Sequence, residues 1–148
     1  MKKMKKQLVK LLNIHGISSD ETRVREYLHP ILTNMMDTVE VDHYGNLLAT
    51  KKIGNGEGAT VLLSAHMDTV RGVLADRKVL ENNGIYTSDK GVLGADDRAG
   101  IAIIMQVLRS IDSLSFEGTV KVAFSREEEI GCVGASKIDD SWYSDVDL

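Results

Sequence analysis

The sequence has little of what marks secreted or membrane proteins. Its 148 residues include a single cysteine, Cys132, so the chain cannot form an internal disulfide. A lack of disulfides is typical of the reducing cytoplasm. The apolar stretch at residues 8–14 is interrupted by Lys10 and Asn13, so neither a signal peptide nor a membrane span is expected. We therefore predict a cytoplasmic protein without a membrane partner.

A strong excess of charge of either sign is also missing. The formal net charge is −4, and the one basic cluster is the N-terminal MKKMKK. Because phosphate binding needs a basic surface, nucleic acid is not expected as a partner. We interpret MKKMKK as the solvated start of a helix in preference to a membrane or nucleic-acid patch. The remaining composition, 43% hydrophobic and 27% charged, indicates one ordinary globular domain.

The hydrophobic pattern predicts helices and strands in an α/β order. Ser18 and Glu21 form a capping-box pattern before the second helix, and Pro30, the only proline, either kinks that helix or marks a shorter one. Asn83 and Gly84 form a hairpin turn signal. The predicted elements are helices at 3–14 and 18–36, strands at 38–42, 46–52 and 60–65, short strands at 79–82 and 85–87, a helix at 98–111, a strand at 118–125 and a short helix at 131–138.

The strands at 60–65 and 118–125, with the helix at 98–111 between them, indicate a crossover unit. Such a unit favours two parallel strands, whose ligand crevice lies beyond their carboxyl ends. His66 directly follows the first strand, three glutamates come soon after the second, and Asp96 precedes the helix. We therefore expect these groups to meet on one rim of the sheet.

His66 and Asp68 form an H-x-D pattern at the end of a buried strand. A neutral imidazole nitrogen is a good zinc ligand, and Asp68 is placed to accept the other ring N–H and fix the tautomer. A lone histidine at such a place is more often a satisfied structural residue. The spacing to Asp68, together with the later acidic clusters, favours a metal ligand.

Two acidic clusters follow at the ends of other core elements, Asp96-Asp97 and Glu127 to Glu129. Helix capping explains one aspartate of the first pair but not both, and a carboxylate can bridge two cations. The glutamate run, taken alone, is more often a solvated turn. In an extended segment neighbouring side chains point to opposite sides, so two of the glutamates share the site only if the backbone turns there.

The sequence contains three motifs, HMDTV, GVLGADDRAG and EEEIG, in the same order as in a known family. They resemble the metal-binding motifs of the cocatalytic zinc exopeptidases, which include peptidase T, glutamate carboxypeptidases and acetylornithine deacetylase, and the peptidase T branch is the most similar. The resemblance covers nearly the whole chain. It implies a three-layer αβα sandwich with a mixed, partly parallel central sheet, and a peptidase that acts on short peptides.

The resemblance also implies roles for five residues. His66 would bind one zinc, Asp68 would orient it, and Asp96, in a cis peptide bond with Asp97, would bridge two zinc ions. Glu128 would be the general base for the attacking water, and Glu129 would bind metal; Glu127 receives no role. The complete site would hold two zinc ions, with cobalt or manganese as alternatives.

The sequence departs from the family pattern after Glu129. The family uses a further carboxylate and a late histidine. Asp145 and Asp147 follow Glu129 too closely in the sequence to be that carboxylate. The other three histidines precede the first motif: they are His15, His29 and His43.

We therefore expect residues 1–148 to form the N-terminal part of a catalytic domain without the lid or dimerisation domain, with little turnover alone. A truncated chain, one half of a split enzyme and a reused domain are open alternatives. A non-catalytic binding or assembly module is the alternative function. An exposed sheet edge would suit a second chain or a homo-oligomer.

Overall fold

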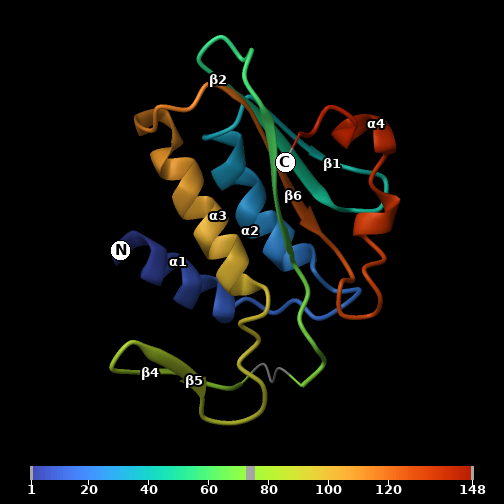
Figure 1. Ribbon diagram of the computed structural model, residues 1–148. Coiled ribbons are helices and arrows are strands. Elements are labelled where there is room, and N and C mark those ends of the chain that lie inside the picture. The colour runs from blue at the N-terminus through green and yellow to red at the C-terminus, as the bar shows by residue number, and fades with distance from the viewer. Residues whose placement is uncertain (1, 73–75, 148) are drawn as a thin grey trace.

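The order of elements in the computed structural model, which describes residues 2–72 and 76–147, follows the hydrophobic pattern closely (Figure 1). The N-terminal half contains α1 (Lys2–Leu12), α2 (Thr22–Thr33), β1 (Thr38–Val41), β2 (Leu47–Ile53) and β3 (Thr60–His66). The second half contains β4 (Val79–Asn82), β5 (Ile85–Ser88), α3 (Arg98–Ser110), the 3-10 turn η1 (Ile111–Ser113), β6 (Gly118–Ser125), the 3-10 turn η2 (Ala135–Lys137) and α4 (Asp140–Tyr143).

The main sheet has the strand order β1-β2-β6-β3. β1 with β2 and β2 with β6 are antiparallel, whereas β3 and β6 are parallel. Helix α3 connects these two parallel strands, so the predicted crossover unit is confirmed. The register runs from Thr60 opposite Thr119 to His66 opposite Ser125, which places the carboxyl ends of both strands at the same edge.

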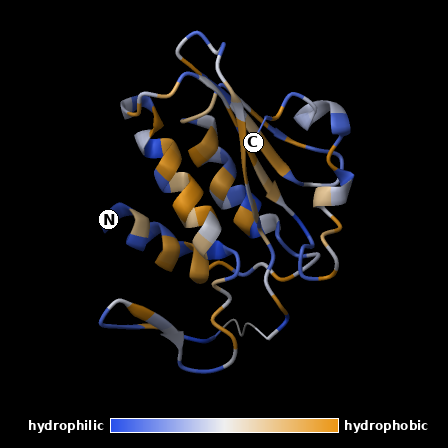
Figure 2. Ribbon diagram, viewed as in Figure 1, coloured by the Kyte–Doolittle hydropathy of each residue, from blue (hydrophilic) through white to orange (hydrophobic). Residues whose placement is uncertain are grey.

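Strand β6 lies between β2 and β3 inside the main sheet, and all its residues are buried because both faces of the sheet are covered there. Val122 and Phe124 belong to a hydrophobic core with residues of α1, α2 and α3. Figure 2 shows hydrophobic residues in orange along these three helices. Because side chains alternate along a strand, Lys121 lies on the opposite face. There its ammonium group donates to the carbonyl oxygen of Trp142 and to the carboxylate of Asp145. The segment around α4 therefore covers the second face, and the predicted α/β fold with a mixed sheet is confirmed.

Two local predictions are wrong. The second helix begins at Thr22, and Glu21, its N-cap residue, makes no side-chain capping bond. The Ser18 hydroxyl donates instead to Asp68, fifty residues away in the sequence, so the capping-box pattern serves a tertiary contact. The predicted helix at 131–138 is reduced to a tight turn followed by η2, because the chain bends back after Glu128. Pro30 lies inside α2, which continues past it to Thr33.

The hairpin of β4 and β5 forms a separate two-stranded sheet below the helices in the view of Figure 1. Asn83 and Gly84 both have positive φ, 50° and 82°, as a tight hairpin turn requires. The predicted turn at these two residues is therefore confirmed.

Strand β3 is one edge of the main sheet. At its first residue, Thr60, the amide donates to Asp147 Oδ2 and the carbonyl oxygen accepts from the Asp147 amide, both at 2.9 Å. Asp147 is therefore held at the end of β3 opposite His66, and Asp145 is paired with Lys121. Among the residues that the structure describes, no helix has the length and apolar character needed to cross a bilayer.

Candidate metal centre

The candidate site begins with His66, the last residue of β3, whose ring is buried and fixed on one side by Asp68. His66 Nδ1 lies 3.0 Å from the Asp68 carbonyl oxygen and 3.2 Å from Asp68 Oδ1. Both partners can only accept, so Nδ1 carries the proton and Nε2 faces the open side of the rim. This is the orientation that a metal-binding imidazole needs.

Asp68 also holds the segment that follows β6. Its Oδ1 accepts from the Glu128 amide at 3.0 Å, and its Oδ2 accepts from the Glu129 amide at 3.1 Å and from the Ser18 hydroxyl at 2.8 Å. Burial alone would raise the pKa of Asp68, but the hydrogen bonds from His66, the two amides and Ser18 hold it well below its usual range. Asp68 is therefore an ionised buried carboxylate that joins the histidine to the glutamate turn.

The two aspartates before α3 divide their tasks. Asp97 Oδ1 accepts from the Gly100 amide at 2.9 Å and caps the helix, and its pKa is raised mainly by burial. A Cβ atom at Gly100 would lie 2.3 Å from that carboxylate, so the cap needs glycine there. The Asp96 side chain is 86% exposed and places Oδ1 3.1 Å from His66 Nε2. The Asp96–Asp97 peptide bond is cis, as the resemblance implies.

The three glutamates after β6 point to different places because the backbone turns at Glu127, whose φ is +52°. Amides of Gly131 and Cys132 donate to the Glu128 carbonyl oxygen and close the turn. Glu129 offers a carboxylate oxygen to a group with His66 and Asp96 in which all three ligand atoms lie within 4.8 Å of one another. Burial raises the pKa of Glu129.

Glu128 lies beside this group, with Oε2 3.7 Å from His66 Nε2. Its other oxygen accepts from Cys132 Sγ at 3.4 Å, and the side chain is 40% exposed. The turn thus brings two neighbouring glutamates to the same rim, which an extended backbone could not do. Glu127, which received no predicted role, is the one that turns away, toward Ser19 and Tyr44.

A cavity of about 380 Å³ opens next to Glu128 on the outer face of β3 and β6. Its polar end is formed by His66, Asp97 and Glu128, and its apolar wall comes from the sheet and from the segment before and within α4. The residues that line the apolar wall include Leu62, Ala123, Ala135, Ile138 and Tyr143. An apolar cleft with a few convergent polar groups is the usual form of a small-molecule site.

Sequence reasoning missed three residues around the site, Ser18, Glu21 and Arg126. Ser18 bonds Asp68, and the buried Glu21 and the half-buried Arg126 form an ion pair at 2.8 Å behind the glutamate turn. The serine and glutamate did stand out in the sequence, but their spacing matched a helix cap equally well. Nothing in a local pattern indicates a partner about one hundred residues away.

Comparison with known proteins assigns the family. A model described as "Peptidase family M28" matches residues 46–147, more than two thirds of the chain. The chain belongs to this peptidase family. The predicted membership of a peptidase T-like exopeptidase family is thereby confirmed.

Individual relatives agree with the family assignment. "Uncharacterized protein YqjE" of Bacillus subtilis (strain 168) is 33% identical over 108 residues, which cover 71% of this chain and 29% of that protein. Peptidase T of Clostridium novyi (strain NT) is 33% identical over 109 residues, 70% of this chain and 26% of that protein. The crystal structure of aminopeptidase PepT from Bacillus cereus ATCC 10987 superposes with a TM-score of 0.87 at 25% identity, over 95% of this chain and 40% of that one. The chain thus spans less than half the length of these relatives.

The side chains at the rim of this M28 chain fit a zinc ion. One imidazole and two carboxylates offer three ligand atoms, which leaves a fourth position of a tetrahedral ion for water or substrate. The Asp68 hydrogen bond fixes the His66 tautomer that leaves Nε2 available to a metal ion. Among residues 2–72 and 76–147, these three side chains are the group that could hold a metal. They come from β3, the loop before α3 and the turn after β6.

The charge on His66 makes metal uptake depend on pH. Burial lowers its pKa, but the hydrogen bond and charge of Asp68, then Asp96 and Glu128, outweigh it and raise the pKa to about 9. At pH 7 the ring is therefore protonated, and a metal ion that binds Nε2 must displace that proton. We expect zinc affinity to rise about tenfold from pH 7 to pH 8, with about one proton released per ion. Calorimetry in two buffers of different ionisation enthalpy measures both, and an affinity that is independent of pH contradicts the assignment.

Proposed function

We propose that this chain carries the catalytic part of a zinc-dependent peptidase that hydrolyses peptide bonds of short peptides. The observation that supports this most is the convergence of His66, Asp96 and Glu129, with ligand atoms within 4.8 Å, beside the carboxylate of Glu128. Peptidase T of Clostridium novyi (strain NT) and aminopeptidase PepT of Bacillus cereus ATCC 10987 are both named as peptidases, and this favours catalysis over a non-catalytic binding module.

In this proposal each residue of the rim has one task. His66, Asp96 and Glu129 hold the ion, and Asp68 keeps the imidazole in its ligand orientation. Glu128 accepts a proton from the attacking water and returns it to the leaving amine, because its carboxylate is needed neither as a ligand nor, like that of Asp97, as a helix cap. Zinc, when bound, would supply the polarisation of the peptide carbonyl and of the water; cobalt and manganese suit the same donors.

The cavity next to Glu128 supports a small substrate. Its polar end coincides with the proposed reacting groups, and its apolar wall could take one side chain of a peptide. A volume of about 380 Å³ suits a few residues better than a folded protein. We propose that short peptides enter with one side chain against Ile138 and Tyr143 and with the scissile carbonyl toward His66.

The three side chains of the rim, His66, Asp96 and Glu129, are enough to hold one metal ion. A second zinc bridged by Asp96 would need ligands beyond His66, Asp96 and Glu129. The chain spans 40% of the aminopeptidase PepT chain, so the two-zinc arrangement and the activity of the whole protein stay proposals. The cytoplasmic location and self-association through the β3 edge likewise stay predictions.

Hydrolysis of tripeptides by the zinc-loaded chain tests the function. We expect release of the N-terminal amino acid above the rate of a chelator-treated sample, slowly if a second ion is required. Binding of a short peptide hydroxamate, whose hydroxamate group ligates zinc, is the second measurement and needs no turnover. We expect it to bind the zinc-loaded chain and not the chelated one. If tripeptides are not hydrolysed and the hydroxamate does not bind, the proposal fails.

A further inference from the structure

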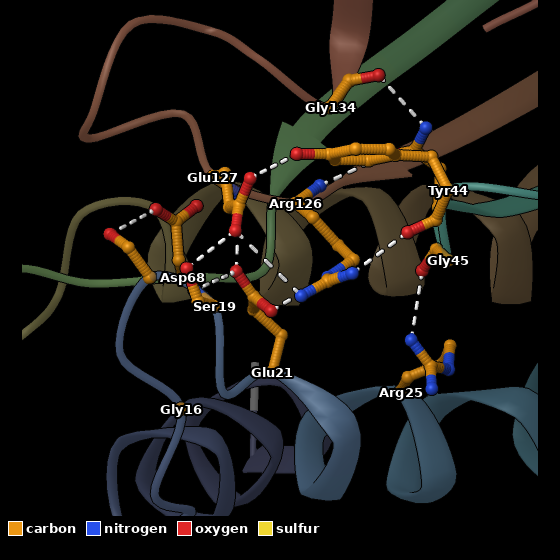
Figure 3. A network of polar contacts seen from close by, with 12 residues as sticks. Gly16, Ser19, Glu21, Arg25, Tyr44, Gly45, Asp68, Arg126, Glu127 and Gly134 are labelled. Carbon is orange, nitrogen blue, oxygen red and sulfur yellow. Dashed lines mark hydrogen bonds and ion pairs between the residues drawn. The ribbon is translucent and has the colours of Figure 1, made fainter. Parts of the chain in front are cut away.

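A buried carboxylate outside the ligand group, that of Glu21, lies directly behind the glutamate turn. Glu21 is fully buried, and although it is the N-cap residue of α2 its side chain does not cap that helix. Its Oε1 accepts from the amides of Ser19 at 2.9 Å and of Glu127 at 3.2 Å, and its Oε2 accepts from Arg126 Nε at 2.8 Å. Figure 3 shows Glu21 between the start of α2 and the turn. The carboxylate therefore serves the turn and not the helix.

The turn is held from two sides by two buried carboxylates. Glu21 accepts from the Glu127 amide, and Asp68 accepts from the amides of Glu128 and Glu129. Three successive N–H groups are thus fixed by acceptors that come from two distant segments. A non-glycine residue with φ of +52°, as at Glu127, persists only where its surroundings hold it. This double hold keeps Glu128 and Glu129 on the side of His66.

Arg126 extends the hold to the loop between β1 and β2. Its Nη1 donates to the Tyr44 carbonyl oxygen at 2.8 Å, and its guanidinium lies over the Tyr44 ring, 5.5 Å from the centroid. The Tyr44 hydroxyl and the Ser19 hydroxyl both donate to the Glu127 carboxylate, which is drawn away from the ligand side (Figure 3). Glu127 is thereby kept out of competition for the metal.

Stability alone gives a weak reason for this ion pair. The carboxylate of Glu21 is fully buried and the Arg126 side chain is 21% exposed, so both charges lose much of their hydration. Buried pairs of this kind are often no more stabilising than apolar residues of the same volume. The pair does fix the orientation of the Arg126 side chain, because its guanidinium bonds Glu21 and the Tyr44 carbonyl oxygen at the same time.

We propose that Glu21 is a positioning residue of the metal centre, which with Arg126 fixes the turn at residues 126–129 so that Glu128 and Glu129 face His66. It touches neither metal nor substrate and acts through the two glutamates. The inference rests on the proposed zinc site for its functional consequence. Its structural part, the ordering of the turn, does not depend on metal.

The test compares Glu21→Gln with Glu26→Gln, an exposed glutamate of the same helix. In the metal-free chain, we expect the amides of Glu127, Glu128 and Glu129 to exchange with solvent at least about tenfold faster in Glu21→Gln, while β6 amides keep their rates. Zinc affinity should fall about 10- to 100-fold, as is usual when an outer-shell partner is lost, and the visible spectrum of bound Co²⁺ should change. Glu26→Gln should match the unmodified chain in all three.

Unchanged turn exchange and an unchanged Co²⁺ spectrum in folded Glu21→Gln would overturn the proposal. If the unmodified chain binds no metal, the proposed zinc site is wrong. Faster amide exchange at the turn in Glu21→Gln would then still show that Glu21 orders the turn, so the two failures can be told apart. Should Glu21→Gln not fold, Arg126→Lys replaces it. A lysine keeps the charge but cannot bond Glu21 and Tyr44 as a fork, so exchange and zinc affinity should change in the same directions. Arg126→Lys that behaves as the unmodified chain would also overturn the proposal.

Discussion

Glu128→Gln should lower the rate of tripeptide hydrolysis about 10²- to 10⁴-fold, the usual contribution of a general base. Glutamine keeps the size of the side chain but cannot take a proton from water at neutral pH. Glu128 is not one of the three proposed ligands, so zinc affinity should stay within a few-fold of the unmodified chain. The measurement is the ratio of the two initial rates at saturating zinc, with affinity from calorimetry.

Glu40→Gln is the matched control, since Glu40 is an exposed glutamate on β1, the edge strand at the other side of the sheet from β3. It should leave both rate and affinity unchanged. A Glu128→Gln variant that retains more than about a tenth of the rate would show that another group takes the proton. A variant that loses both zinc and activity would show instead that Glu128 is a ligand, and the roles of the two glutamates would have to be exchanged.

His66→Ala should weaken zinc binding by more than about 100-fold. Loss of an outer-shell partner of a ligand costs up to about that factor, so loss of the ligand itself should cost more. The imidazole is also the one nitrogen donor of the group, and two carboxylates alone form a poorer zinc site. Competition with a chromophoric chelator measures the affinity.

His43→Ala is the control, because His43 is exposed in the loop between β1 and β2. We expect it to bind zinc as the unmodified chain does. If His66→Ala and His43→Ala lose affinity equally, zinc is held by scattered surface histidines and the rim is not its site. The thermal unfolding of metal-free His66→Ala should still be cooperative, which separates loss of the ligand from loss of the fold.

The sequence indicated the part of the fold that brings the three proposed ligands together. A long apolar run that ends in His66, an apolar helix and a second buried strand can pack in few ways, and the crossover rule makes the two strands parallel. Once β3 and β6 are parallel, His66 and the residues after Ser125 must lie at one edge. That is why the convergence of the three proposed ligands could be predicted although they are up to sixty-three residues apart in the sequence.

The supporting contacts could not be predicted in the same way. Ser18 and Glu21 match a helix cap, and the energy of a cap is similar to that of the tertiary bonds that they form instead. The choice between these depends on Asp68 and Arg126, which come close only after the sheet has formed. The orientation of Glu127 depends on its positive φ, and a glutamate in the sequence gives no indication of positive φ, which is uncommon for residues other than glycine.

Residues after the turn show the same limit. A helix was predicted at 131–138, but the amides of Val133 and Gly134 donate back to the carbonyl oxygens of Glu127 and Arg126 and leave only the short turn η2. Gly134 packs so closely that a Cβ atom there would lie 2.2 Å from the Arg126 carbonyl oxygen. The glycine thus serves a close approach of two backbones, which a local pattern cannot distinguish from the start of a helix.

Anomalous diffraction at the zinc edge, from crystals of the chain grown with one equivalent of zinc, tests the central claim most directly. The account predicts one dominant peak about 2.0 to 2.2 Å from His66 Nε2 and from one carboxylate oxygen each of Asp96 and Glu129. A dominant peak held by other residues, or by His66 with both carboxylates turned away, would contradict it.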